Sequence, residues 1–362
     1  MKIQRKIKVG VLFGGRSAEH EVSLVSGASV MRALNKKKYE VVPIGITKEG
    51  RWIFGSKALT VLKDGKESPD RYQPLSADPT DRLHKLDVIF PVLHGTFGED
   101  GAIQGLLELS GLPYVGCGVL GSSMGMDKIS QKKIFLTAGI PTPKFIYTTA
   151  AEYKAQSRRI LERVYHDLGF PCFVKPSNLG SSVGISKVKS TKQLRSAVVL
   201  AFKYDRRVII EQAVADPLEI ECAILGNDSP KASVVGQIIS NNEFYDYDAK
   251  YVDGRSKAKI PASIPKNVAD KVRAFALMAF KALDLAGMSR VDFLVTRRGN
   301  IYINEVNTIP GFTSISMFPK LWAASGLKYS NLLDKLISLA IERSAVKKRL
   351  NTSYRPKQNW YS

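Results

Sequence analysis

Near the C-terminus, Arg290 and Asp292 lie two residues apart, and so do Glu305 and Asn307, which is the spacing of side chains on one face of a strand. If residues 288–307 form a hairpin, Asp292 lies opposite Glu305 and Arg290 lies opposite Asn307. Because strand side chains alternate, all four then share one face. Facing carboxylates repel each other unless a cation lies between them, and oxygen donors without histidine suit Mg²⁺ or Mn²⁺ bridging phosphates. This pattern predicts a metal site, with a solvated hairpin face as the alternative.

A glycine- and serine-rich segment, KPSNLGSSVG at 175–184, could bind phosphate. The backbone N–H groups of such a turn can surround phosphate oxygens, and Lys175 would add a positive charge. An ordinary flexible hairpin with an exposed lysine explains the segment equally well.

The segment FYDYDAKYV at 244–252 is dense in aromatic and charged residues, and Gly254, Pro261 and Pro265 follow it. A long loop of this composition suits a lid over an active site. A partly exposed strand and connector is an equal alternative.

Other nucleotide and metal patterns are weaker. Residues 116–121, GCGVLG, match a dinucleotide-binding pattern, but no acid occurs about 20 positions later, around 139–141. We therefore expect only a tight strand-to-helix turn there. The glycines and lysine of GSSVGISK have the wrong spacing for a P-loop, and the four histidines lack the spacing of zinc ligands.

The composition is that of a folded protein without a membrane span. Of the 362 residues, 44% are hydrophobic and 24% charged, which excludes a mainly disordered chain. There is no run of about 18 apolar residues, and the N-terminus does not resemble a signal peptide. Three scattered cysteines without a CxxC pair favour reduced thiols in a cytosol.

The net charge raises the question of a polyanionic partner. Lysine and arginine number 54 against 33 acids, giving +21. Ten of these excess charges lie in residues 1–8 and 343–362, which contain no acid, and +11 remain elsewhere. No RNA-binding aromatic strand or zinc-finger spacing accompanies the charge, so nucleic-acid binding is not expected as the main function.

Alternating strands and helices predict an α/β fold that opens with a parallel sheet. In the first part we expect strands at 8–15, 39–47, 86–95 and 112–116, with helices at 16–34 and 101–111. Further on we expect strands at 170–177, 185–188, 208–214, 288–296 and 300–307, with helices at 128–139, 191–204, 266–285 and 329–346. The predicted domains are 1–125, 126–217 and 218–346, followed by a basic tail at 347–362.

Seven segments together resemble the D-alanine–D-alanine ligases of the ATP-grasp superfamily, in the family's order and over about residues 7–340. They are GGRSAEHEVSL, HGTFGEDGAIQG, LPYVGCGVLGSSMGMDK, VKPSNLGSSVGISKV, EFYDYDAKY, SRVDFLV and NEVNTIPGFTSIS. The resemblance implies a Rossmann-like N-terminal domain followed by an ATP-grasp fold. The implied reaction joins two D-alanines through a D-alanyl phosphate, at the expense of ATP, for peptidoglycan precursors.

The resemblance also implies a role for each matching residue. The first D-alanine would be bound by Glu19 and His94, the second by Lys250 and Ser316, and the oxyanion by Arg290 and the Gly311 N–H, with Tyr251 on the lid. ATP would contact Lys128, Lys175, Ser181, Ser182, Glu211, Gln212, Val214, Glu219, Phe244 and Lys250. Two Mg²⁺ or Mn²⁺ ions would be held by Asp292, Glu305 and Asn307.

The nearest alternative is a D-alanine–D-lactate ligase on the same fold. Tyr251 stands where dipeptide-forming relatives have tyrosine, which favours the dipeptide. Another ATP-grasp carboxylate–amine ligase and, from a different class, a basic nucleic-acid-binding protein are the remaining alternatives. The resemblance further implies a homodimer in a bacterial cytoplasm, with small-molecule substrates and with no nucleic-acid or membrane partner.

Overall fold

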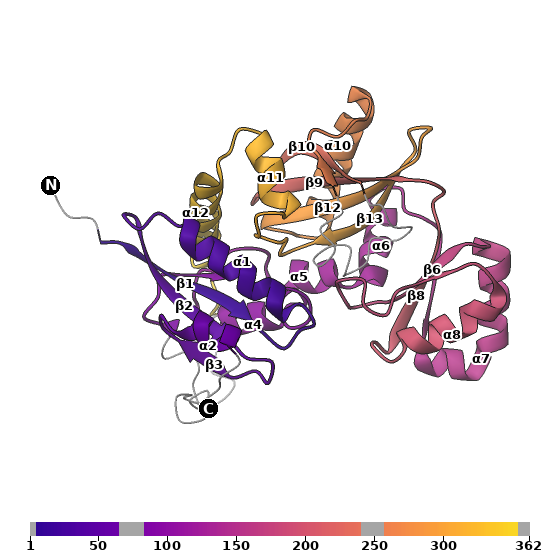
Figure 1. The fold of residues 1–362 in the computed structure, drawn as a ribbon, viewed down its shortest axis with the longest axis horizontal. Helices are drawn as coiled ribbons and strands as arrows, with labels where there is room; N and C mark the ends of the chain where they lie inside the picture. Colours follow the sequence, from indigo (N-terminus) through magenta and orange to yellow (C-terminus); the bar gives the residue numbers. More distant parts are fainter. Residues whose placement is uncertain (1–4, 65–82, 240–256, 354–362) are drawn as a thin grey trace, which may run out of the picture.

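Three sheets organise the protein (Figure 1). The computed structural model describes residues 5–64, 83–239 and 257–353. The N-terminal and central sheets lie towards opposite ends of the long axis in Figure 1. Among the described residues, no helix has the length and apolarity needed to cross a membrane.

The N-terminal sheet is mainly parallel, as the alternating pattern predicts. Its order is β3 (Trp52–Phe54), β2 (Tyr39–Ile46), β1 (Ile7–Gly14) and β4 (Val88–Pro91), with only β3 antiparallel. The accompanying helices are α1 (His20–Ala33), α2 (Ala58–Asp64) and α4 (Ala102–Leu109). Val9, Val11 and Phe13 are fully buried, because a central parallel strand is covered on both faces.

The strand expected at 112–116 is wrong in extent. Only a single bridge forms there, between Tyr114 and Ile89. Gly111 and Gly116 on either side have φ of 65° and 98°, which ends the extended conformation at both ends.

The central sheet is antiparallel and is covered by three helical segments. Its order is β5 (Phe145–Thr149), β8 (Arg207–Gln212), β6 (Cys172–Pro176) and β7 (Ser186–Val188), with α7 (Ala150–Arg163), η2 (Val164–Leu168) and α8 (Thr191–Ala201) packed against it. The segment with β5 and α7 was not predicted, although its sequence contains a capping box. Thr149 and Glu152 bond each other's backbone N–H groups, which fixes the start of α7.

The C-terminal sheet carries an apolar face and a mixed face. Its order is β11 (Lys257–Lys259), β10 (Lys231–Ile239), β9 (Leu218–Gly226), β12 (Gly287–Val295) and β13 (Ile301–Asn307). On one face Ile220, Cys222 and Phe293 pack with α10 (Lys266–Ala282). The opposite face is apolar at Ala223, where α11 (Met317–Ala324) covers it. It is charged nearer the start of β9, at Glu221 and Glu219.

The predicted hairpin register is confirmed. Arg290 pairs with Asn307, and Asp292 pairs with Glu305. A bulge after Asp292 then shifts the register by one residue, so that Phe293 faces Ile303 inside the core.

Two helical regions connect the sheets. The first contains α5 (Val119–Met126) and α6 (Lys128–Thr137), and Phe135 of α6 packs into the core of the C-terminal sheet. The second is α12 (Tyr329–Lys347), whose Leu332, Leu336 and neighbouring leucines share a core with β1 and β4. These contacts hold the sheets around one central region, while the domain boundaries at 125, 217 and 346 stay predictions.

Candidate active site

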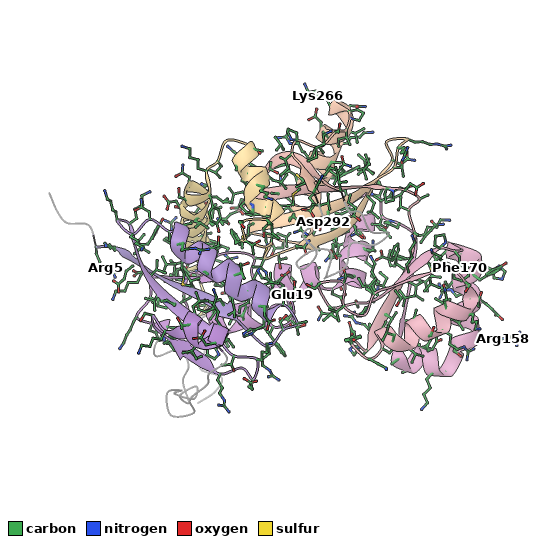
Figure 2. All side chains as sticks on the ribbon, in the orientation of Figure 1. Arg5, Glu19, Arg158, Phe170, Lys266 and Asp292 are labelled. Atoms are coloured by element: carbon green, nitrogen blue, oxygen red, sulfur yellow. The ribbon has the colours of Figure 1, made fainter. Side chains whose placement is uncertain are left out.

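A cavity of about 210 Å³ lies where the three sheets meet. Figure 2 labels Glu19, at the start of α1, and Asp292, in β12, in this middle part of the molecule. The cavity brings together nine residues predicted from the sequence: Glu19, His94, Lys128, Ser181, Arg290, Glu305, Asn307, Gly311 and Ser316. They come from segments up to about 300 residues apart, so only the fold unites them.

The predicted metal-binding residues form a charged hydrogen-bonded cluster. Arg290 donates through Nε and Nη2 to the two carboxylate oxygens of Asp292, at 2.8 and 2.7 Å. Asn307 Nδ2 donates to Asp292 Oδ2 at 2.9 Å, and Lys128 Nζ lies 3.6 Å from Glu305 Oε2. The cation required between the carboxylates is therefore supplied here by Arg290 and Lys128.

The donor set of this cluster fits a divalent cation with hard-ion chemistry. Asp292 and Glu305 offer carboxylate oxygens, and the amide of Asn307 keeps its oxygen available while its nitrogen bonds Asp292. Among the described residues no group of three or more His, Cys, Asp or Glu side chains has an arrangement that could hold a metal ion. A bound ion would therefore depend on the Asn307 oxygen and on oxygens of its ligand.

Arg290 also lies against a second buried carboxylate, that of Glu221 in β9. Its Nε is 3.1 Å from Glu221 Oε2. Burial alone would lower the pKa of Arg290, but Asp292 and Glu221 raise it well above its ordinary value. The guanidinium thus stays charged. Sequence reasoning missed Glu221; the two-residue spacing of Glu219 and Glu221 in β9 was the available signal.

A buried lysine–glutamate cluster lies in the central sheet, at the predicted nucleotide side. Lys175 Nζ donates to Glu211 Oε2 at 2.9 Å, and Lys132 Nζ lies 3.4 Å from Glu211 Oε1. Burial would raise the pKa of Glu211, yet the two lysines hold it below its usual value. Lys132 was missed, although it follows Lys128 by four residues on α6 and so faces the same side.

Three other residues predicted to bind ATP, Gln212, Val214 and Glu219, do not line the cavity. The side chain of Gln212 donates to the Leu168 carbonyl at 3.0 Å, on the face opposite to Glu211, because neighbouring strand residues alternate. Its backbone is the part that can line the predicted adenine cleft. Val214 follows β8, and Glu219 lies on the charged face of β9. Phe244, Lys250, Tyr251 and the predicted lid lie outside the described residues.

The serine-rich turn at 178–184 lies close to both Lys128 and Glu19 of the cavity. Lys128 Nζ donates to the Leu179 carbonyl at 2.7 Å, which ties this turn to α6. Ser181 and Ser182 have φ of 52° and 59°, a conformation that is costly for non-glycine residues and that is found at anion-binding turns. A Cβ on Gly180 would lie 2.9 Å from Glu19 Oε2, so the turn passes close to the Glu19 carboxylate.

Asp127, which sequence reasoning missed, fixes the base of this turn. Its carboxylate accepts from the Ser130 N–H and hydroxyl at 2.9 and 2.7 Å, from Ser177 Oγ at 2.6 Å and from Arg207 Nη2 at 2.5 Å. It thereby caps α6 and joins it to β6 and β8. Lys128 comes directly after Asp127 in the chain, and the serine-rich turn comes directly after Ser177. These bonds therefore fix the starting points of both.

Replacing Asp127 with asparagine should cost about 3 kcal/mol of stability at pH 7, because Arg207 then loses its buried partner. Burial tends to raise the pKa of Asp127, but Ser130, Ser177 and Arg207 lower it overall. The unfolded chain therefore binds more protons, and the stabilisation present above about pH 4 is lost as pH falls through the folded pKa.

Urea unfolding at pH 7 and pH 3 checks this prediction, with Asp270→Asn, an exposed acid 3.7 Å from Arg273, as the control. We expect a clear loss of stability for Asp127→Asn at pH 7 that shrinks at pH 3, and none for the control. An equal loss at both pH values would contradict the assigned role of the charge.

The first-substrate corner contains two acids beside a buried histidine. His94 Nδ1 donates to the Ile309 carbonyl at 3.1 Å and lies 3.9 Å from Glu99 Oε1. Burial would lower the pKa of His94, but Glu99 and Glu19 raise it. Burial and the charge of Glu19 raise the pKa of Glu99. Negative potential of this kind suits an ammonium group; Glu99, within the HGTFGEDG motif, was not singled out from the sequence.

Another part of the cavity wall is formed by Ser316, the N-cap residue of α11. Its hydroxyl accepts from the Thr313 N–H at 3.0 Å, and a Cβ on Gly311 would lie 2.6 Å from it. The N-terminus of a helix favours a carboxylate, and Lys257 and Lys320 add positive charge to the same cavity. The cavity thus offers an ammonium corner, a cation and phosphate region, and a carboxylate corner.

Family models match most of the chain. The model described as "D-ala D-ala ligase N-terminus" matches residues 8–117, and the one described as "D-ala D-ala ligase C-terminus" matches residues 134–338. Curated proteins named D-alanine–D-alanine ligase are similar throughout: one from Acetivibrio thermocellus is 48% identical, covering 93% of this chain and 96% of the relative. One from Caldicellulosiruptor bescii is 50% identical, covering 96% and 99%.

Solved structures agree with this assignment. The VanG D-Ala:D-Ser ligase of Enterococcus faecalis is 38% identical with a TM-score of 0.82, covering 93% of this chain and all of that one. The D-alanine–D-alanine ligase of Coxiella burnetii is 36% identical with a TM-score of 0.79, covering 95% and 97%. On the matched models and the near full-length relatives, this chain belongs to the D-alanine–D-alanine ligase family.

Proposed function

We propose that the protein joins two D-alanine molecules into D-alanyl-D-alanine, converting ATP to ADP and phosphate, for peptidoglycan precursor synthesis. The observation that carries this proposal is one cavity with three chemically distinct regions. Glu19 marks the ammonium corner, Glu305 and Asn307 mark the cation and phosphate region, where Asn307 Nδ2 bonds Asp292, and Ser316 marks the carboxylate corner.

In the first step the donor carboxylate attacks the γ-phosphate, forming D-alanyl phosphate and ADP. Glu19 holds the donor ammonium group with His94 nearby in support, while Lys128 and Lys175 orient the phosphates. Two Mg²⁺ or Mn²⁺ ions held by Asp292, Glu305 and Asn307 would neutralise phosphate charge. The chain's own contribution is positioning and electrostatic stabilisation, as in phosphoryl transfer generally.

In the second step the amine of the acceptor attacks the acyl phosphate carbonyl and phosphate leaves. Arg290 and the Gly311 N–H stabilise the tetrahedral oxyanion, a contribution of about 3 kcal/mol per donor. Ser316 and the start of α11 hold the acceptor carboxylate. Because water would hydrolyse the acyl phosphate, the predicted lid at 244–252 would have to cover this step.

The identity of the acceptor is the main alternative within the family. A structural relative with a TM-score of 0.82 is described as a D-Ala:D-Ser ligase, whereas the curated relatives cited above carry the D-alanine–D-alanine name. D-lactate is the other alternative acceptor, and Tyr251 stays the predicted basis for preferring an amine. These alternatives share D-alanine as the donor and differ in the acceptor, which is proposed to bind at Ser316.

Phosphate release in the presence of ATP, Mg²⁺ and D-alanine tests the proposal, with products identified by mass. We expect release that requires D-alanine and yields D-alanyl-D-alanine. D-serine or D-lactate, added with limiting D-alanine, should give little mixed product. A mixed product in excess of the dipeptide would move the assignment to another acceptor, and no release with D-alanine would refute the donor assignment.

We also propose that the protein acts as a homodimer in the bacterial cytoplasm, without a nucleic-acid partner. The support is the family membership given above. Sedimentation equilibrium of the full chain checks the dimer. DNA retention that survives deletion of residues 343–362 would instead assign a function to the net charge of +21.

A further inference from the structure

Arg290 and Asp292 are unusually closely coupled for two residues of one strand. They lie two positions apart in β12 and so share a face. Nε and Nη2 of Arg290 each donate to a different oxygen of Asp292, at 2.8 and 2.7 Å. This two-point bond is the strongest geometry available to an arginine and a carboxylate.

The bond conflicts with the two proposed roles of these residues. Arg290 neutralises the Asp292 carboxylate and takes one lone pair on each of its oxygens, so a divalent cation competes with the guanidinium for that carboxylate. The Nε and Nη2 hydrogens that Arg290 gives to Asp292 are in turn not available to an oxyanion, which leaves only its other Nη hydrogens. Arg290 cannot simply be released, because its side chain is only 19% exposed and a buried charge without a partner is costly. A second carboxylate must therefore be within reach of the guanidinium.

Glu221 meets this requirement. It lies in β9 directly opposite Asp292 in the strand register, and its Oε2 is 3.1 Å from Arg290 Nε. Its side chain is 9% exposed, so it provides a carboxylate within the buried site itself. Glu221 can hold Arg290 from the β9 side while the Asp292 oxygens turn to another cation.

We propose that Arg290 serves as an internal counter-cation of Asp292, which a divalent cation displaces, and that Glu221 is the positioning residue that receives the displaced guanidinium. The inference rests on the proposed function in taking Asp292 as a metal ligand. Its consequence is an order of assembly: the Nη2 donor that Arg290 gives to Asp292 becomes available to substrate only once the metal is bound, while Nε stays with Glu221. The apo site keeps its charges paired, and the loaded site presents a cation to the cavity.

Mn²⁺ binding to the full-length protein without nucleotide tests the displacement, read from the EPR signal of the free ion. Asp292→Asn should weaken binding most. Arg290→Lys keeps the charge but loses the two-point bond, so it should tighten Mn²⁺ binding about fivefold. Glu221→Gln removes the carboxylate that would receive the displaced guanidinium, so it should weaken binding about fivefold.

Glu40→Gln is the control, since it removes the same charge from a strand residue whose Oε1 lies 3.7 Å from Lys8 Nζ. Its Mn²⁺ affinity should stay within about twofold of the wild type, because Glu40 does not line the cavity and its charge is exposed to solvent. Unchanged affinity in Arg290→Lys, with binding still dependent on Asp292, would overturn the inference alone. Binding independent of Asp292 would overturn the metal assignment of the proposed function as well.

A second readout does not depend on the folding of a Glu221 variant. The ¹⁵N resonance of Arg290 Nε, assigned by its loss in Arg290→Lys, should shift when Mg²⁺ is added to the wild type and stay in place in Asp292→Asn. A resonance that Mg²⁺ leaves unmoved in the wild type, at concentrations that saturate Asp292-dependent binding, would mean that the guanidinium remains on Asp292. That result would overturn the inference.

Discussion

Glu305→Gln should lower the turnover number by about a thousandfold while leaving the fold intact. The substitution keeps the shape of the side chain but removes one of the two charged oxygen donors in the predicted metal site. The lost charge would stabilise the metal and phosphates in the transition state, so the loss should appear in kcat and not only in KM. Because the Glu305 side chain is 24% exposed, little stability should be lost.

Glu40→Gln is the matched control for this experiment. Glu40 also lies on a strand, and its Oε1 is 3.7 Å from Lys8 Nζ, much as Glu305 lies 3.6 Å from Lys128. It is remote from the cavity, so its kcat should equal that of the wild type. A Glu305→Gln enzyme with near-normal turnover at saturating Mg²⁺ would refute the assignment of the hairpin as the metal site.

Lys175→Met should lower kcat/KM for ATP by at least about a hundredfold. Lys175 provides a positive charge at the end of β6, and its bond to Glu211 fixes both side chains. Removing it leaves Lys132 as the ion-pair partner of Glu211. The predicted nucleotide site then loses a phosphate contact and the bond that fixes the Glu211 side chain. Stability should fall by less than for an isolated buried carboxylate, because Lys132 still balances the charge.

Nucleotide titration and steady-state kinetics with varied ATP measure this effect. Lys133→Met is the control, because Lys133 is exposed and lies over the ring of Tyr147 at 4.3 Å, away from Glu211. The control should bind ATP normally. An unaltered KM for ATP in Lys175→Met, with the protein folded, would contradict the placement of the nucleotide phosphates beside β6.

The metal-site geometry could be predicted because it depends on local rules. The two-residue period of strands placed Arg290, Asp292, Glu305 and Asn307 on one face, and the structure has that register. The loop that reverses the chain between β12 and β13 is short, so little else could change the pairing. The bulge after Asp292 was not foreseen, but it lies beyond the four site residues and leaves their register unchanged.

The partners of these residues could not be predicted in the same way. Lys128 meets Glu305, and Arg290 meets Glu221, only after the sheets and α6 have packed. Such contacts join residues far apart in sequence, and no periodicity reports them. Asp127 was recognisable only as a helix cap; its bonds to Ser177 and Arg207 depend on how β6 and β8 approach α6.

Local signals also account for the remaining differences in the fold. The Thr149–Glu152 capping box was present in the sequence and predicts the start of α7, which went unassigned. The apolar residues at 112–116 have strand composition, yet the positive φ of the flanking glycines limits them to one bridge. Backbone conformation at glycine outweighed strand propensity there.

Transfer of oxygen from substrate to phosphate tests the central claim most directly. D-alanine labelled with ¹⁸O in its carboxylate is incubated with the protein, Mg²⁺ and unlabelled ATP, and the products are resolved by mass. Activation through D-alanyl phosphate predicts one ¹⁸O in the released phosphate for every D-alanyl-D-alanine formed, with the other labelled oxygens kept in the dipeptide. Unlabelled phosphate, or AMP and pyrophosphate in place of ADP and phosphate, would contradict the proposed ligase chemistry.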